Sequence, residues 1–125
     1  MLKWCSVSHI LIIEDDPFVA ITIEDILREQ GASSVSIAAS QTEAVDAALV
    51  QRPDLITSDV RLADGSGPLA VRAIHEKLGP IPVIFITGTP AECSPRAPED
   101  IILAKPLDHK AMAIAFRQAT GQGCE

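Results

Sequence analysis

Aromatic residues are nearly absent from this chain of 125 residues, which holds one Trp, three Phe and no Tyr. Since 47% of the residues are hydrophobic, a sizeable core can still form, and it must be aliphatic. Cysteine is also scarce: Cys5, Cys93 and Cys124 are widely spaced and form no Cys-x-x-Cys pair. A zinc site or a disulfide framework is therefore not expected, and free thiols in a reducing compartment are.

Positively charged residues are also few: the chain has 10 Lys and Arg against 17 Asp and Glu, which gives a formal net charge of −7. Binding to nucleic acid or to an anionic membrane needs clustered basic residues, so we expect neither partner. No apolar run approaches the length of about 20 residues that crosses a bilayer. The apolar run near the start suits a strand better than a signal peptide. These absences predict a soluble cytoplasmic protein.

The length suits one compact domain, residues 1–125, with a core over about 9–120 and the form of a stand-alone protein. Short apolar runs alternate with segments of helical spacing along the whole chain. Because most of these runs are continuously apolar, the pattern predicts a parallel sheet with helices on both faces. The predicted strands are residues 10–13, 35–38, 54–58, 82–86 and 101–104.

Helix starts are marked by capping residues. Asp16-Pro17 places a good N-cap before a proline at the first helical position. Ser40 and Glu43 have the spacing of a capping box, and Asp108 is suited to cap the last helix. Between the last two strands, by contrast, Pro90, Pro95 and Pro98 lie close together. Proline cannot continue a helix interior, so any fourth helix there is a turn or two, or absent.

Polar residues stand where the predicted strands end: Glu14-Asp15 after the first, Asp59 after the third, Thr87 after the fourth and Lys105 after the fifth. In an open parallel sheet, ligands bind outside the carboxyl ends of the strands. We therefore expect three carboxylates, one hydroxyl and one ammonium group to converge on one edge of the sheet.

This set of groups suits phosphoryl transfer. Neighbouring carboxylates repel one another unless a hard cation such as Mg²⁺ lies among them. A carboxylate can also be the nucleophile and form an aspartyl phosphate. Such transfer depends on positioning and on neutralising charge on the phosphoryl oxygens, for which a cation, Lys105 and the Thr87 hydroxyl are suited.

Taken singly, each of these residues has an ordinary structural interpretation. Glu14 and Asp15 could simply begin a helix, since acids favour helix N-termini, and most lysines are exposed. The combination at one sheet edge favours function, whereas Asp16 is expected to act only as a cap. The histidines show no metal-binding spacing and are expected to be structural or exposed, and Cys93 is expected to be an inert thiol.

With these residues placed, the sequence resembles the receiver domains of response regulators in two-component signalling. The resemblance runs from about residue 10 to residue 119. Each piece is weak alone, and their order along the chain makes them specific together. The pieces are Ile12-Ile13-Glu14-Asp15-Asp16-Pro17, Asp54-Leu55-Ile56-Thr57-Ser58-Asp59, Asp64-Gly65-Ser66-Gly67, Ile84-Phe85-Ile86-Thr87-Gly88 and Lys105-Pro106.

The resemblance implies an α/β, flavodoxin-like (βα)5 three-layer sandwich with strand order 2-1-3-4-5 and a shortened or irregular fourth helix. It implies that Asp59 accepts a phosphoryl group from a histidine kinase or a histidine phosphotransfer protein. Mg²⁺ is then held by Asp15, by Glu14 through water, by Asp59 and by the Arg61 backbone carbonyl. Thr87 turns toward the phosphoryl group, Lys105 pairs with it, and Lys105-Pro106 resembles the cis peptide of the family.

Such a protein is not an enzyme in the usual sense, since it catalyses only its own phosphorylation and dephosphorylation. Its output is expected through protein contact or phosphate relay, by a monomer or a weak dimer, with the downstream partner open. The traits around Thr87 resemble receivers of the alphaproteobacterial general stress response.

Two departures from the family bear on output. Ile102 stands where the family usually has an aromatic residue, and the proline-rich segment looks shorter than usual. The missing aromatic residue at Ile102 supports an alternative, an adaptor that works without phosphorylation. A third hypothesis, a Mg²⁺-dependent phosphohydrolase, lacks the Asp-x-Asp motif at the first strand and the length for a cap.

Overall fold

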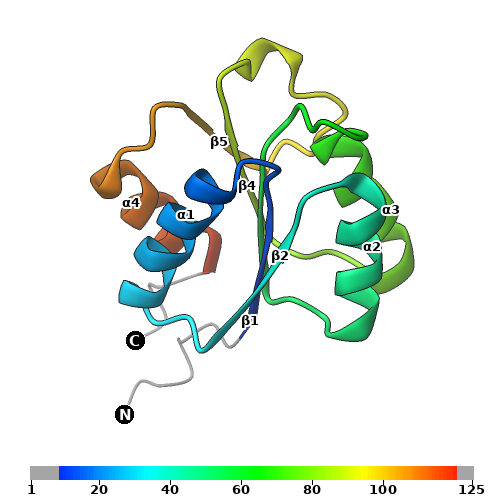
Figure 1. Cartoon of the computed structure of the whole chain (residues 1–125), viewed down its shortest axis with the longest axis horizontal. Helices are drawn as coiled ribbons and strands as arrows, with labels where there is room; N and C mark the ends of the chain where they lie inside the picture. The colour runs from blue at the N-terminus through cyan, green and yellow to red at the C-terminus, as the bar shows by residue number, and fades with distance from the viewer. Residues whose placement is uncertain (1–8, 121–125) are drawn as a thin grey trace.

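The computed structural model describes residues 9–120, which form a single parallel sheet flanked by helices. The five strands lie in the order β2-β1-β3-β4-β5, as the family resemblance implied. Every neighbouring pair is parallel, so all the carboxyl ends lie at one edge, the upper edge in Figure 1. The strands are β1 (His9–Ile13), β2 (Ser34–Ala38), β3 (Leu55–Ser58), β4 (Val83–Thr87) and β5 (Ile101–Ala104).

Two helices cover each face of the sheet (Figure 1). Helices α1 (Pro17–Glu29) and α4 (His109–Thr120) lie on one face, and α2 (Gln41–Val50) and α3 (Gly67–Leu78) lie on the other. Successive side chains of a strand point to opposite faces, which divides the core in two. Thus Ile10 and Ile12 of β1 pack with α1 and α4, whereas Leu11 and Ile13 pack with α2 and α3.

The predicted caps are present at the helix starts. Asp16 Oδ1 accepts hydrogen bonds from the backbone N–H groups of Phe18 and Val19. Ser40 Oγ accepts from the N–H of Glu43, but the Glu43 carboxylate accepts from the N–H of Ala39 rather than from that of Ser40. In this capping box the Glu43 carboxylate therefore bonds one residue earlier than expected, and it still satisfies a free backbone donor ahead of α2.

The segment between β4 and β5 holds only one short 3-10 turn, η2 (Pro90–Glu92), within the described residues. This confirms the expectation that the proline-rich stretch prevents a regular fourth helix. In Figure 1 this yellow segment lies above the carboxyl ends of the strands. The segment begins at the edge of the sheet where the polar residues meet. It ends at the opposite edge, because Ile101 pairs with Ile84 near the start of β4.

The structure does not describe every residue that the sequence singles out. Trp4, Cys5 and Cys124 lie outside the described residues. Cys93 is buried and packs in the core beneath α2 and α3. Burial raises the pKa of its thiol above the ordinary value, which supports an inert role at neutral pH. Among the helices within residues 9–120, none is both long enough and apolar enough to cross a membrane.

Candidate functional site

Three carboxylates meet at the carboxyl edge of the sheet. Glu14 and Asp15 directly follow β1, and Asp59 directly follows β3. Because β1 and β3 are hydrogen-bonded neighbours in parallel register, their ends lie side by side. One carboxylate oxygen from each of the three residues lies within 4.8 Å of the others. The convergence expected from the sequence is therefore present, and its donors are the hard oxygen ligands that Mg²⁺ prefers.

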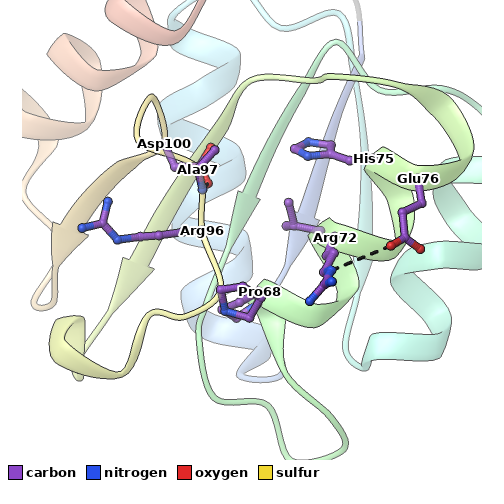
Figure 2. Close-up of a pocket in the computed structure, with 9 residues that line it drawn as sticks. Pro68, Arg72, His75, Glu76, Arg96, Ala97 and Asp100 are labelled. Carbon is purple, nitrogen blue, oxygen red and sulfur yellow. Dashed lines mark hydrogen bonds and ion pairs between the residues drawn. The ribbon is translucent and has the colours of Figure 1, made fainter.

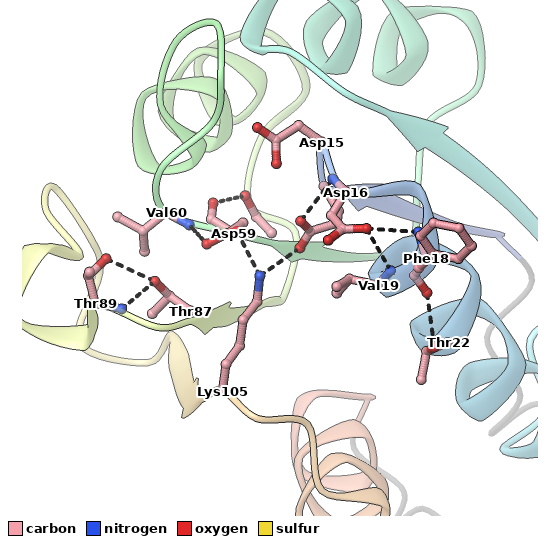
Figure 3. A network of polar contacts seen from close by, with 12 residues as sticks. Asp15, Asp16, Phe18, Val19, Thr22, Asp59, Val60, Thr87, Thr89 and Lys105 are labelled. Carbon is pink, nitrogen blue, oxygen red and sulfur yellow. Dashed lines mark hydrogen bonds and ion pairs between the residues drawn. The ribbon is translucent and has the colours of Figure 1, made fainter.

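Lys105 reaches this cluster from the end of β5 (Figure 3). Its backbone N–H donates to the Thr87 carbonyl at 2.8 Å, which fixes the start of the side chain beside β4. The Nζ atom then lies 2.8 Å from Asp59 Oδ2 and 3.2 Å from Glu14 Oε1. One ammonium group therefore contacts two of the three carboxylates and partly neutralises the cluster.

Burial and charge act in opposite directions on these groups. The Glu14 side chain is 1% exposed, and this burial raises the pKa of its carboxyl group. The N–H of Asp16 and the charge of Lys105 lower that pKa, but burial, aided by the charge of Asp59, prevails. Burial also lowers the pKa of the Lys105 ammonium, but the hydrogen bonds and charges of Asp59 and Glu14 outweigh it and leave that pKa raised. Lys105 is therefore firmly cationic.

The backbone around Asp59 holds its carboxylate in place. Its N–H donates to the Ile13 carbonyl at 2.9 Å, and Oδ1 accepts from the N–H of Val60 at 2.7 Å. The Ser58 hydroxyl donates to the Asp59 carbonyl at 2.7 Å. Since Oδ2 faces Lys105, each oxygen of the carboxylate has a separate donor. This fixed orientation suits a nucleophile, for which positioning matters most.

Asp15 and Asp16 have different surroundings despite their adjacency. Asp15 Oδ2 accepts from the N–H of Ala63, in the loop that follows Asp59, at 2.6 Å. Asp16 points to the start of α1 and caps it. Only Asp15 therefore belongs to the acidic cluster, as the sequence indicated.

Thr87 is 1% exposed and stands at the end of β4. Its hydroxyl oxygen accepts from the N–H of Thr89 at 2.9 Å and lies 3.1 Å from the Thr89 hydroxyl. Figure 3 shows this group directed toward Thr89 and away from Lys105. The hydroxyl expected to contact a phosphoryl group is therefore engaged with the following loop.

The Arg61 side chain is 71% exposed, and its Nε atom lies 3.5 Å from Glu92 Oε1 in η2. The Arg61 side chain therefore faces solvent. The proposed role of its backbone carbonyl as a metal ligand stays a prediction.

Ile102 occupies the position where an aromatic residue was expected from the family. It lies in β5, is half-buried, and packs against the core beneath α2 and α3. An aliphatic side chain held there has no polar tip to present to a partner. The change of side chain is therefore also a change in what this face of β5 displays.

A groove of about 410 Å³ lies between α3 and residues 95–100, where the chain forms no regular helix (Figure 2). It contains none of the acidic-cluster residues, so it is separate from the site described above. Its lining residues are Pro68, Val71, Arg72, His75, Glu76, Pro95, Arg96, Ala97 and Asp100.

Several contributors could not be found from the sequence. Thr89 and Glu92 contact Thr87 and Arg61 only because of the path of an aperiodic loop. Gly67 packs so closely on the Asp59 carbonyl that an added Cβ would overlap it. The Asp-Gly-Ser-Gly stretch was the only signal for Gly67, and it did not say which glycine makes this approach.

The sheet order, the acidic cluster and the bridging lysine together define a receiver domain, the phosphorylatable module of two-component signalling. The comparison with known families agrees. The chain belongs to the response regulator receiver domain family, whose model matches residues 10–116.

The relatives specify the type of receiver. The chain is 36% identical over 115 residues to the phyllosphere-induced regulator PhyR of Methylorubrum extorquens, covering 90% of this chain and 43% of PhyR. It is 34% identical to the anti-anti-sigma factor PhyR of Bartonella quintana, with a TM-score of 0.79 over 94% of this chain and 49% of that one. The chain thus spans about half the length of these relatives.

A third match bears on the metal. A receiver domain of a sensor histidine kinase from Pseudomonas aeruginosa carries a magnesium ion coordinated in its active site cleft. It is 30% identical, with a TM-score of 0.79, over 91% of this chain and 98% of that one. Receiver domains thus bind Mg²⁺ in an acidic site, and this chain has an acidic cluster that fits one.

Proposed function

We propose that Asp59 accepts a phosphoryl group from a phosphohistidine of a sensor kinase or phosphotransfer protein, in the cytoplasm. The observation that carries this is the placement of the Lys105 ammonium 2.8 Å from Asp59 Oδ2, beside two further carboxylates. A lysine at a strand end does not require three acidic neighbours, and three carboxylates without a cation repel one another. The combination suits a site that receives a dianionic group together with a cation.

In the proposed step, a carboxylate oxygen of Asp59 attacks phosphorus and forms the bond of an acyl phosphate. The bond from phosphorus to the histidine nitrogen breaks, and that nitrogen keeps the electron pair. Lys105, already paired with the carboxylate, offsets charge on the transferred oxygens. Thr87 contributes a hydroxyl donor once it leaves Thr89.

Glu14, Asp15 and Asp59, with the Arg61 carbonyl, are the groups that would hold Mg²⁺, and the carboxylate donor set fits it. When bound, Mg²⁺ supplies positive charge to the phosphoryl oxygens. The chain's own part is to fix those ligands, with Asp15 tied to the N–H of Ala63 and Asp59 tied to that of Val60.

Labelling by a small phosphodonor, such as phosphoramidate with Mg²⁺, tests the acceptor. Wild type should gain an acid-stable, base-labile phosphate and Asp59→Asn should gain none. Asp64→Asn is a matched control, because Asp64 is exposed in the loop beyond the site and should label normally. Full labelling of Asp59→Asn would refute the assignment.

For output we propose contact with a protein partner, or passage of the phosphoryl group along a relay. Support comes from the membership of the chain in the receiver family and from its similarity to PhyR of Bartonella quintana, which is an anti-anti-sigma factor. The expected result is a change in partner affinity on phosphorylation. Pull-down with wild type, with and without beryllofluoride, measures it, with Asp59→Asn as the control.

A second candidate, the adaptor that works without phosphorylation, is favoured by one observation, the aliphatic Ile102 on β5. It predicts equal partner binding by wild type, by phosphorylated protein and by Asp59→Asn. The same pull-down distinguishes the two functions.

A further inference from the structure

The loop after β4 is attached to the site by hydrogen bonds of Thr89. Its N–H and its hydroxyl both meet the Thr87 hydroxyl, at 2.9 and 3.1 Å (Figure 3). The same loop forms a small turn of its own, since the Glu92 N–H donates to the Thr89 carbonyl at 2.9 Å. Residues 89–92 therefore form a unit, here named the 89–92 turn, with one attachment through Thr87.

A second attachment joins the 89–92 turn to the loop that carries Asp59. Arg61 Nε lies 3.5 Å from Glu92 Oε1, and Arg61 is two positions beyond Asp59. Both side chains are more than half exposed, at 71% and 54%. Exposed ion pairs of this kind are weak and screened by salt, so a stronger partner can displace one.

The far end of the turn is fixed. Cys93 is 6% exposed and packs in the core beneath α2 and α3. Its N–H donates to the Pro90 carbonyl at 3.1 Å. The 89–92 turn is thus fixed at Cys93 and otherwise held by Thr87, at the end of β4, and by Arg61, two positions beyond Asp59.

A phosphoryl group on Asp59 competes for both attachments. The acyl phosphate carries about two negative charges where the free carboxylate carried one, and it offers three terminal acceptor oxygens. A guanidinium binds such a group through charge-assisted and often bidentate hydrogen bonds, which are stronger than an exposed pair with one carboxylate. The Thr87 hydroxyl can likewise donate a hydrogen bond to one of the phosphoryl oxygens.

We infer that Arg61 exchanges partners, pairing with Glu92 when Asp59 is free and with the phosphoryl group when Asp59 is modified. The exchange frees the 89–92 turn together with the release of Thr89 from Thr87. This inference rests on the proposed function and adds to it Arg61, as a cation that binds the phosphoryl group, and Glu92, as the carboxylate that competes for Arg61. Through this exchange, phosphorylation of Asp59 changes the exposed 89–92 turn without depending on the side chain of Ile102.

The test is a double-mutant cycle on the affinity for beryllofluoride with Mg²⁺, a mimic of the phosphoryl group. Glu92→Gln removes the competitor and should tighten binding about two- to fivefold, the size of an exposed ion pair. Arg61→Gln should weaken binding about tenfold or more, as for a lost hydrogen bond to a charged group. In the Arg61→Gln background, Glu92→Gln should then have no effect.

The cycle separates exchange from a general effect of charge. If Glu92 acted only through its negative charge near the site, its removal would tighten binding equally with or without Arg61. Glu99→Gln is the matched control, since it removes one exposed acid from the same segment and should leave affinity unchanged. Additive effects of the two substitutions would overturn the inference.

Nuclear magnetic resonance gives a second measurement. Beryllofluoride should shift the Arg61 Nε–H and the Thr89 and Glu92 amide signals in wild type. In Arg61→Gln the Glu92 amide should shift less. Failure of wild type to bind beryllofluoride would contradict the proposed function itself, whereas binding without a shift at Arg61 would contradict only the exchange.

Discussion

The ammonium group of Lys105 lies 2.8 Å from Asp59 Oδ2, although 46 positions separate the two residues. The contact spans the end of β4, which lies between β3 and β5 in the sheet. The same group lies 3.2 Å from Glu14 Oε1, whose side chain is almost fully buried. One ammonium group therefore pairs with two acidic side chains at this edge of the sheet, and removing it has a predictable cost.

Lys105→Met should lower the free energy of unfolding by about 1–2 kcal/mol without divalent cations, since it leaves a partly buried cluster of like charges unpaired. Urea unfolding measures it. Lys110→Met is the control, because Lys110 is exposed on α4 and should cost little. Added Mg²⁺ should recover part of the loss, and equal midpoints for the two variants would contradict the prediction.

Magnesium should stabilise the wild type. Binding to the folded state alone adds about 2.7 kcal/mol at a concentration of 100 times Kd. Asp15→Asn should abolish most of this effect because it removes one of the three carboxylates. The measurement is the melting temperature over a Mg²⁺ titration, with Asp64→Asn expected to respond like wild type.

Asp16→Ala distinguishes the cap from the ligands. It removes the acceptor for the N–H groups of Phe18 and Val19, so the free energy of unfolding should fall by about 1 kcal/mol. Stabilisation by Mg²⁺ should stay the same size. Loss of that stabilisation in the variant would place Asp16 among the ligands instead.

Gly67→Ala should disrupt the site directly. An added Cβ would overlap the Asp59 carbonyl oxygen and the Ser58 hydroxyl. The carbonyl oxygen belongs to the backbone of Asp59, so it cannot move without displacing that residue. The expected cost is about 3 kcal/mol, at the upper end for overpacking. Gly88→Ala is the matched control, since its Cβ would meet nothing within 4 Å. Comparable unfolding curves for the two variants would argue against this close approach.

His9, the first residue of β1, gives a pH dependence at the edge of the sheet opposite the acidic cluster. It is buried, with Nδ1 2.7 Å from Ser34 Oγ and Nε2 3.1 Å from Ser36 Oγ. Burial lowers the pKa of its ring below the ordinary 6.5, although the charge of Asp54 acts in the other direction. The unfolded state therefore binds the proton more readily. The stability contributed by neutral His9 is full above pH 6.5 and is lost as pH falls toward the folded-state pKa.

Unfolding by urea over this pH range checks the prediction. The slope of the unfolding free energy against pH should diminish in His9→Gln, whatever the overall cost of the substitution. An unchanged slope in His9→Gln would show that the ring titrates alike in both states.

Much of the fold was predictable because its signals are local. Apolar runs such as 10–13 and 83–86 specify buried strands, and Asp16, Ser40 and Asp108 fix where helices begin. Strand ends differed from the predicted bounds by about one residue, as at Leu55 and Val83. The strand order came from the family resemblance, since hydrophobic pattern alone does not order parallel strands.

By itself the sequence determined which residues stand at the strand ends, and therefore that Glu14, Asp15, Asp59, Thr87 and Lys105 share one edge. Only the tertiary structure decided how their side chains are used. The Thr87 hydroxyl is taken by Thr89, and Arg61 is paired with Glu92. These contacts depend on the path of residues 88–100, whose prolines remove the periodicity that makes a segment predictable, so packing on the sheet edge sets that path.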